Sequence, residues 1–539
     1  MRHPSSAARK FCARSGREPN FVLPSSKRLA ITIAFLSALI FAQWRAAVAD
    51  PSDPVLNLLL QKGIISQQEL EKTKAEAEAI RTNNTTLPPT ESKWKIGNGI
   101  KNVELFGDLR LRYENRQAHD PADGRIELNR ERIAVRLGLR GEVLDDFYYG
   151  LRLDTANNPR SPWVSLGTSS SGAPYQGPFG KSTFNINVGQ VYLGWKPASW
   201  LDITAGKMPN PLYVTPMIWD TDLNPEGLAE RFKYTIGQAD LFINLGQFLY
   251  QDTNPTHASK GYFNLGYDSS TPAFMLAWQA GFNYHITKDI SLKVAPTLYN
   301  YTGHGVNAAP SPSTPDFRGV FIGQGSTNGV GGTPGVFYSG FPSGPYDGFV
   351  DNQTGINDLL VLDIPFELNF NFGCLSTRLF GDYAQNLQGS ERARAAFRAQ
   401  DSPLLAEAGL IRIPSAQTGD TKAYQVGVAI GSTNSLGLVY GSTVRRHAWE
   451  ARAYWQHVEQ YALDPNLLDS DFFEGRGNME GIYGAFAYGF SENVIGTIRY
   501  GYGQRINDKL GTGGSNQDIP QMNPISHYSI LQLDLTLRF

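Results

Sequence analysis

The last nine residues constrain the fold of this chain more than any other segment. From Leu531 to Phe539 the odd positions are apolar and the even positions are polar. Successive side chains of a strand point to opposite faces, so this segment has one apolar and one polar face. Soluble domains rarely leave such a strand on an exposed edge, whereas a closed barrel in a bilayer needs lipid outside and water inside. The alternative is the last strand of an ordinary sandwich.

The same two-residue period recurs along the chain from about residue 95. It is clearest in residues 103–114, 130–140 and 360–372, although Pro365 interrupts the third and is expected to mark a bulge. Further strands are expected to begin near Asp146, Phe184, Leu201, Gln238, Ala273, Ile290, Leu375, Ala423, Ala448, Gly481 and Asn493. The pattern predicts an all-β fold, a transmembrane antiparallel β-barrel of about 16 strands over residues 95–539, with short periplasmic turns and long outer loops.

The N-terminus has the pattern of a secretory signal peptide. Lys27 and Arg28 precede a 14-residue apolar run over residues 29–42, which is short for a spanning helix of roughly 20 residues. Ala47-Val48-Ala49 is a small-x-small cleavage site, so residues 1–49 are expected to be removed. A start codon placed too far upstream would explain the long basic stretch before Lys27. An uncleaved membrane anchor is the alternative.

Charge and cysteine usage exclude several classes of protein. Without residues 1–49 the chain has 40 Lys and Arg against 49 Asp and Glu, a net charge of −9, which argues against nucleic acid as a partner. Of the two cysteines, Cys12 leaves with the signal peptide, so Cys374 has no partner for an intramolecular disulfide or a Cys-based zinc site. An exported chain of this size must then gain its stability from another source, and a barrel ladder in which every backbone group is paired supplies it.

Residues 50–94 differ in composition from the rest. Residues 54–62 predict a short apolar helix that ends at Gly63. Ser66 and Glu69 form a capping box that begins a second helix, which runs to about residue 81. Residues 83–89 are a linker. We expect this periplasmic helical segment to have a role in oligomer assembly, with contact to peptidoglycan or a loose attachment as alternatives.

Arginines dominate the polar faces of the first three expected strands. Guanidinium groups keep their charge and offer fork-like donors, so rows of them on the inner face attract anions and carboxylates. Acids on other polar faces would then create a transverse field across the lumen. The alternative is that these charges pair with one another and rigidify the wall. The predicted pore-lining residues are Arg110, Arg112, Arg130, Arg132, Arg136, Arg140, Asp108, Asp363 and Glu367.

Two segments are too long to be turns. Residues 303–357 are rich in Gly, Pro and Ser, and residues 388–421 include Arg392, Arg394 and Arg398. Long unstructured loops are usually functional or disordered. One of the two could fold inward and narrow the lumen, or both could be extracellular loops that touch nothing.

One block is distinctive enough to suggest a family. The sequence GKMPNP at residues 206–211 is followed by WDTDLNPEGLA at residues 219–229. Together with an N-terminal LLxKGIIS-x-x-EL pattern, the arginine-rich second strand and residues 449–472, it resembles the putative porin family of Gram-negative proteobacteria. The resemblance covers essentially the whole mature chain and implies a transmembrane barrel for passive diffusion of small solutes. It offers no catalytic or binding residues, and the long pre-signal segment and residues 303–357 depart from it.

Other chemistries find little support. The alternation of Asp220, Asp222, Asn224 and Glu226 resembles the start of an EF-hand loop. Pro225 stands at the sixth position, where an EF-hand needs Gly, so the sequence does not fit an EF-hand. A calcium site of another kind and a plain turn are the alternatives. Neither G-x-S-x-G nor H-E-x-x-H occurs. The glycines of residues 323–329 do not have the spacing of a dinucleotide loop.

We therefore expect a porin in the outer membrane of a Gram-negative bacterium, without enzymatic activity and without a cofactor. Its expected partners are outer-membrane lipid, small hydrophilic solutes, two further copies in a homotrimer, and the barrel-assembly machinery, since the terminal Phe539 resembles the assembly signal of outer-membrane proteins. An anion- or phosphate-selective porin, an outer-membrane barrel enzyme and a structural barrel are the alternatives.

Overall fold

The computed structural model describes most of the chain after residue 98. The described residues are 99–121, 123–144, 146–156, 160–167, 185–251, 273–302, 359–393, 419–441, 445–508, 510–512, 518–519, 522 and 524–539. The predicted signal peptide, the helical segment of residues 50–94 and the loop at residues 303–357 lie outside this part of the chain, as does most of the segment at residues 388–421. Those expectations stay predictions.

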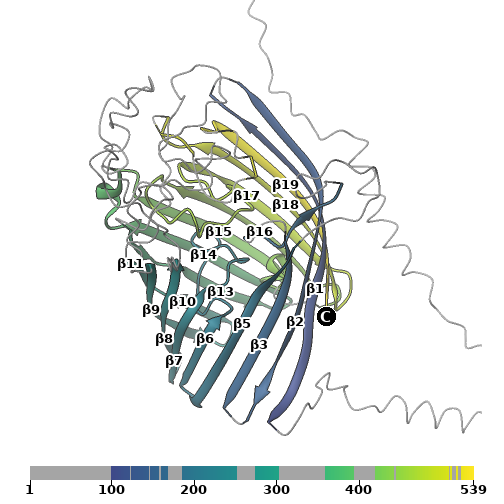
Figure 1. Ribbon diagram of the computed structural model, residues 1–539, viewed down its shortest axis with the longest axis vertical. Coiled ribbons are helices and arrows are strands. Elements are labelled where there is room, and N and C mark those ends of the chain that lie inside the picture. The colour runs from purple at the N-terminus through teal and green to yellow at the C-terminus, as the bar shows by residue number, and fades with distance from the viewer. Residues whose placement is uncertain are drawn as a thin grey trace, which may run out of the picture. The chain divides into compact units, whose positions relative to one another are not determined.

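The described strands form one closed antiparallel barrel (Figure 1). The strands are β1 (Ile100–His119), β2 (Arg125–Val143), β3 (Phe147–Ala156), β4 (Val164–Ser165), β5 (Asn185–Ala198), β6 (Leu201–Lys207), β7 (Glu226–Ile236), β8 (Ala239–Gln251), β9 (Ala273–Thr287), β10 (Ile290–Val294), β11 (Thr297–Thr302), β12 (Leu360–Asp363), β13 (Phe366–Phe372), β14 (Leu375–Asn386), β15 (Lys422–Ser432), β16 (Trp449–Val458), β17 (Met479–Gly489), β18 (Val494–Arg505) and β19 (His527–Arg538).

These pieces make 16 wall strands, as the sequence predicts. β4 is a two-residue piece beside β2, and β10 with β11 and β12 with β13 are each one interrupted strand. The last strand, β19, pairs with β1 and closes the wall. Phe539 exchanges two backbone hydrogen bonds with Gly107, at 2.9 and 3.1 Å, so the pairing continues to the final residue.

Two prolines stand side by side where the interrupted strands break. Pro296 separates β10 from β11, and Pro365 separates β12 from β13. Proline has no N–H for the ladder, so the hydrogen bonding lapses there. The expected bulge at Pro365 is wrong: Asp363 lies opposite Ala384 and Phe366 lies opposite Gly381, so no extra residue is inserted.

The alternation separates the two faces of the wall as predicted. On β2, Leu137 and Leu139 are 45% and 39% exposed, whereas Arg132 and Arg136, on the opposite face of the same strand, are each 8% exposed. Exposed large apolar side chains of this kind recur on nearly every strand. A surface so apolar suits contact with acyl chains, and the polar face is left to the interior.

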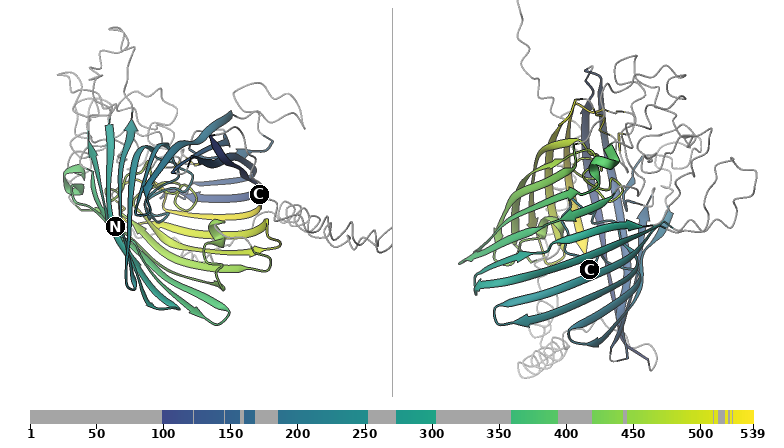
Figure 2. Two further views of the ribbon diagram at one scale, coloured as in Figure 1. Left: turned by 90° about the horizontal axis from the view of Figure 1, so that it is seen from below. Right: turned by 90° about the vertical axis from the view of Figure 1, so that its left-hand side faces the viewer.

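Short connections gather at one end of the barrel, here named the turn end, and longer ones at the other, the loop end (Figure 2). Most turn-end connections have two to four residues. Residues 433–448 are an exception to the predicted short turns, because they contain the 3-10 helix η2 (Leu438–Tyr440), where Leu438 and Val439 are buried. Among the described residues, no helix is long and apolar enough to cross a membrane.

Candidate functional site

The connection between β6 and β7, residues 208–225, is anchored first to the β9–β14 side of the wall. The Tyr213 backbone exchanges hydrogen bonds with the Gln279 amide of β9, at 2.8 and 2.9 Å. The Tyr213 hydroxyl donates to Glu367 of β13 at 2.9 Å. Two residues later, the Thr215 hydroxyl donates to the buried Asp382 of β14. This end of the segment is therefore fixed by polar contacts to three strands.

The other end of the same segment reaches the β2 side. Asp222 is ion-paired with Arg136 of β2, and Asn224 accepts a hydrogen bond from Gln190 of β5 at 2.9 Å. In the strand order, β2 and β14 are separated by many strands in both directions round the wall. The segment therefore spans the interior from one wall to the other, and we name it crossing segment A (residues 208–225).

The connection between β16 and β17, residues 459–478, makes a second span and is named crossing segment B. Asp471 accepts a 2.9 Å hydrogen bond from Arg112 of β1, while Asn466 donates to the Tyr250 hydroxyl of β8 at 2.7 Å. The two crossing segments also bind each other. The Asp220 N–H donates to the Leu467 carbonyl at 2.7 Å, and the Asp220 carboxylate accepts from the N–H and hydroxyl of Ser470.

All six predicted arginines lie on the polar face, and each has an acidic partner within 4.0 Å. Arg112 is held by both oxygens of Asp534, at 2.7 and 2.9 Å. The other pairs are Arg110 with Asp108, Arg130 with Glu114 and Asp518, Arg132 with Glu114, Arg136 with Asp222 and Asp154, and Arg140 with Glu104. The arginines and acids are therefore interleaved rather than placed on opposing walls.

Glu114 of β1 is the centre of this network. It is fully buried and accepts from Arg116 at 3.0 Å, from Arg130 and, at 2.9 Å, from Gln532. Arg132 lies 3.7 Å away. A buried carboxylate is tolerated only with such partners, because an unpaired charge in a poorly solvated site is very costly. Glu114 is not among the predicted lining residues, although it stands on the polar face of residues 103–114.

The predicted acidic lining residues fall into two groups. Asp108 lies beside Arg110 in the arginine network. Asp363 and Glu367 lie on the far side, on β12 and β13: Asp363 is fully buried, and Glu367 binds Tyr213 of crossing segment A and Arg378. The structure therefore brings together the arginines with Asp108, but not with Asp363 and Glu367.

Carboxylates of the crossing segments have divergent pKa values. Burial, with the nearby charge of Asp222, raises the pKa of Asp220 to about 7. Burial and the Asp220 charge raise the pKa of Asp469 well above its ordinary value. Burial acts in the same direction on Asp471, but the charges of Arg112, Arg499 and Arg116 together outweigh it and hold that pKa below its usual range. The junction of the two segments thus brings together carboxyl groups with raised and with lowered pKa values.

The calcium alternative gains no support in the part of the chain that the structure describes. No group of three or more His, Cys, Asp or Glu side chains there could hold a metal ion. Asp220 instead caps a turn, accepting from the Asp222 N–H at 2.8 Å, and Glu226 begins β7 beside Lys207. The plain-turn interpretation accounts for these residues.

Open space remains on the turn-end side of the crossing segments. A cavity of about 540 Å³ is lined by arginines of β1, β2, β3 and β18, by Asp222 and Asp471, and by residues of the η2 connection. A second cavity, of about 800 Å³, lies against β5 to β10 and shares no lining residue with the first. Charged side chains line both.

The sequence singled out crossing segment A only as a family marker. Inward folding was expected of residues 303–357 or 388–421, which lie wholly or mostly outside the described residues. The contacts that reveal the crossing join distant residues, such as Asp220 with Ser470 and Asp222 with Arg136. No local pattern encodes them. Tyr213 and Asp471 were missed for the same reason.

Comparison with known proteins identifies a family for this chain. No curated protein matches the sequence. Solved structures that align with the chain include OmpT of Vibrio cholerae, at 10% identity and a TM-score of 0.37, and OmpF of Salmonella typhi in complex with daunomycin, at 9% identity and a TM-score of 0.39. Each alignment covers 83% of this chain and all of the other. The model of the putative porin family matches residues 120–318 and 358–539. The chain therefore belongs to the putative porin family and is an outer-membrane channel-forming β-barrel.

Proposed function

We propose that this protein is a passive diffusion channel for small hydrophilic solutes in the outer membrane of a Gram-negative bacterium. The observation that carries the proposal is the placement of crossing segments A and B, which span the interior yet leave charged cavities beside them. A barrel with a purely structural role would not need charged cavities beside segments that cross its interior. Solutes would pass between the crossing segments and the wall, where size and charge decide their rates.

The constriction in this proposal keeps the predicted arginines and Asp108, adds acids of the crossing segments, and leaves Asp363 and Glu367 on the opposite side of the interior. Arg110, Arg112, Arg130, Arg132, Arg136 and Arg140 supply one side, and Asp222 and Asp471 complete it. Because each arginine is paired, the field at the constriction is a mosaic of alternating charge rather than a cationic ring. Such a mosaic orients dipolar solutes and holds water without trapping one ion.

The pairing weakens the case for strong phosphate selectivity at the arginines. A phosphate-selective porin needs guanidinium groups without acidic partners. Here Glu114, Asp222 and Asp534 form ion pairs with arginines of the predicted lining. The enzyme alternative has no positive support among the described residues, where no motif or metal-binding cluster points to catalysis. We propose four features together: channel function, assembly as a homotrimer, contact of the apolar face with lipid, and insertion by the barrel-assembly machinery through the last strand.

Planar-bilayer recording tests the channel directly. The purified protein should give stepwise, ohmic current increments in KCl, and proteoliposomes should swell in small sugars faster than in oligosaccharides. The reversal potential in a salt gradient gives the sign and strength of ion selectivity. A folded barrel that inserts without conductance would contradict the proposal.

A further inference from the structure

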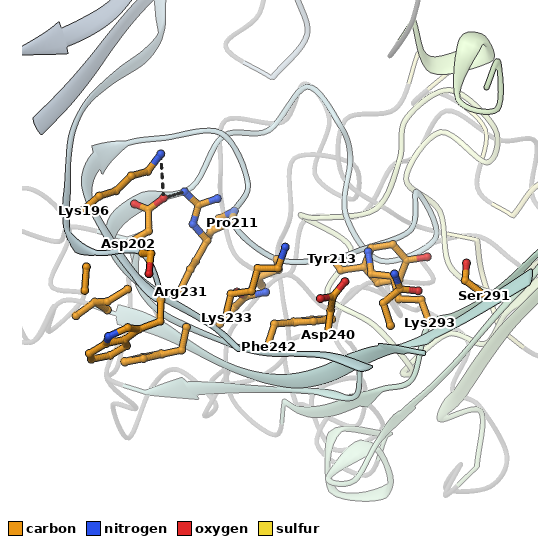
Figure 3. A pocket seen from close by; sticks show the side chains of 18 of the residues that line it. Lys196, Asp202, Pro211, Tyr213, Arg231, Lys233, Asp240, Phe242, Ser291 and Lys293 are labelled. Atoms are coloured by element: carbon orange, nitrogen blue, oxygen red, sulfur yellow. Dashed lines mark hydrogen bonds and ion pairs between the residues drawn. The ribbon is translucent and has the colours of Figure 1, made fainter. Parts of the chain in front are cut away.

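The second cavity carries a row of cations on the inner wall at the turn end. Its volume is about 800 Å³, and Figure 3 shows Lys196, Arg231, Lys233 and Lys293 following one another along it. Tyr213, the first anchor of crossing segment A, lies at the Lys293 end. A solute that has passed this segment would therefore meet these side chains.

Two of the three acids in the cavity wall are already neutralised by their own cations. Asp202 binds Arg231 at 2.5 Å and lies 3.9 Å from Lys196. Glu367 is 3.3 Å from Arg378, which lies outside the cavity lining. Each of these two carboxylates therefore already has a cationic partner within 4.0 Å.

The third acid, Asp240, is also engaged. It accepts a hydrogen bond from Thr235 at 2.6 Å and lies 3.2 Å from the His285 ring. Among the described residues, no carboxylate lies within 4.0 Å of the ammonium group of Lys233 or Lys293. Within the described part of the chain, the cavity therefore presents two ammonium groups that form no ion pair within 4.0 Å, although the charges of Asp240 and Glu367 act on them from further away.

An aromatic ring lies between these two lysines. Phe242 pairs in register with Lys233 on one side and with Gly281 on the other. Because Gly281 has no side chain, the Phe242 ring covers it; an added Cβ would come within 2.4 Å of the ring. The Lys293 ammonium lies 5.8 Å from the Phe242 ring centroid and 3.5 Å above the Tyr213 ring.

We propose that this cavity is a subsite for small organic anions that carry one carboxylate on a flat apolar group, of which benzoate is the simplest. The carboxylate binds between the Lys233 and Lys293 ammonium groups, and the flat group stacks on Phe242. This deepens the proposed channel function and rests on it. The site raises the local concentration of such anions beside crossing segment A and so favours their passage.

Current block by benzoate tests the subsite in the reconstituted, full-length channel. Benzoate added on the turn-end side should reduce the chloride current saturably, and acetate should do so at least tenfold less well. K233Q together with K293Q should weaken the benzoate block at least tenfold. K288Q is the matched control: Lys288 is 90% exposed in the β9–β10 turn, outside the cavity lining, and should leave the block unchanged.

A second measurement keeps the inference separate from the channel proposal. Isothermal titration of benzoate into the detergent-solubilised trimer or monomer needs no conductance, and F242L should remove the advantage of benzoate over acetate. Equal benzoate affinity in the wild type and the double lysine variant overturns the subsite and leaves the channel standing. Benzoate binding without any conductance overturns the channel instead. Inorganic phosphate that competes as well as benzoate overturns the aromatic part of the assignment.

Discussion

Asp222 of crossing segment A is ion-paired with Arg136 of β2, although β3, β4, β5 and β6 intervene between them along the chain. The contact holds the far end of the segment against the wall opposite its Thr215 anchor on β14. Both side chains are largely removed from solvent, at 18% and 9% exposure. This charge pair, whose residues are 86 positions apart in the sequence, therefore helps to fix crossing segment A against the β2 wall.

Removing that pair should release the segment. We expect D222N to cost about 1–3 kcal/mol of folding stability, since it leaves the Arg136 guanidinium partly buried and short of one partner. The current should become noisier, and the reversal potential should shift toward anions. R140Q is the control for stability, because the Arg140–Glu104 pair is half exposed and should contribute under about 1 kcal/mol. Equal melting points for the two variants would contradict the anchoring role.

Glu114 should be the least replaceable carboxylate of the wall. E114Q leaves Arg116 and Arg130 without their shared buried anion, so we expect a loss of about 3–5 kcal/mol in the free energy of unfolding. Urea titration of the refolded protein measures it. E127Q is the matched control, since Glu127 pairs with Arg125 at an exposed position; a cost as large as that of E114Q there would point to a general charge effect.

The contact between the crossing segments should depend on pH. The raised pKa of Asp220, about 7, means that the folded protein retains a proton that the unfolded chain has lost. This contribution to stability is complete below the ordinary aspartate pKa and is lost as pH rises to about 7. We expect the melting temperature of the wild type to fall relative to that of D220N between pH 5 and 7.5. Parallel curves would show that Asp220 does not titrate in this window.

The closed barrel should resist detergent until it is heated. Sixteen wall strands, with β19 paired to β1, leave no free edge where unfolding can begin. The folded monomer of an unheated sample should therefore run faster on a denaturing gel than the unfolded chain of a boiled sample. The proposed homotrimer should appear in the unheated lane as a slower band that is lost on heating. Identical mobility with and without heating would mean that the purified protein is not a closed barrel.

The wall was predictable from the sequence because its signal is local. Alternation over residues 130–140 and 360–372 gave strands with the correct face inward, and Pro365 did not disturb the register. β7 was missed, since Glu230 stands on its apolar face and breaks the pattern. The number of strands was predicted from the spacing of the expected strands along the chain alone.

The interior was less predictable because its contacts are long-range. The arginine face was visible, but the identity of each partner depends on how strands and crossing segments meet: Arg112 pairs with Asp534 and Asp471, hundreds of residues away. The sequence alone did not decide whether the wall charges create a transverse field across the lumen or pair with one another. The described geometry favours pairing, while the predicted role of these residues in the pore stays a proposal.

Single-channel recording of the wild type beside D222N tests the central claim most directly. If crossing segment A narrows an open aqueous path, the wild type should show discrete ohmic openings, and D222N should show larger or more variable openings with a shifted reversal potential. An electrically silent wild type, or two channels identical in conductance and selectivity, would contradict the account.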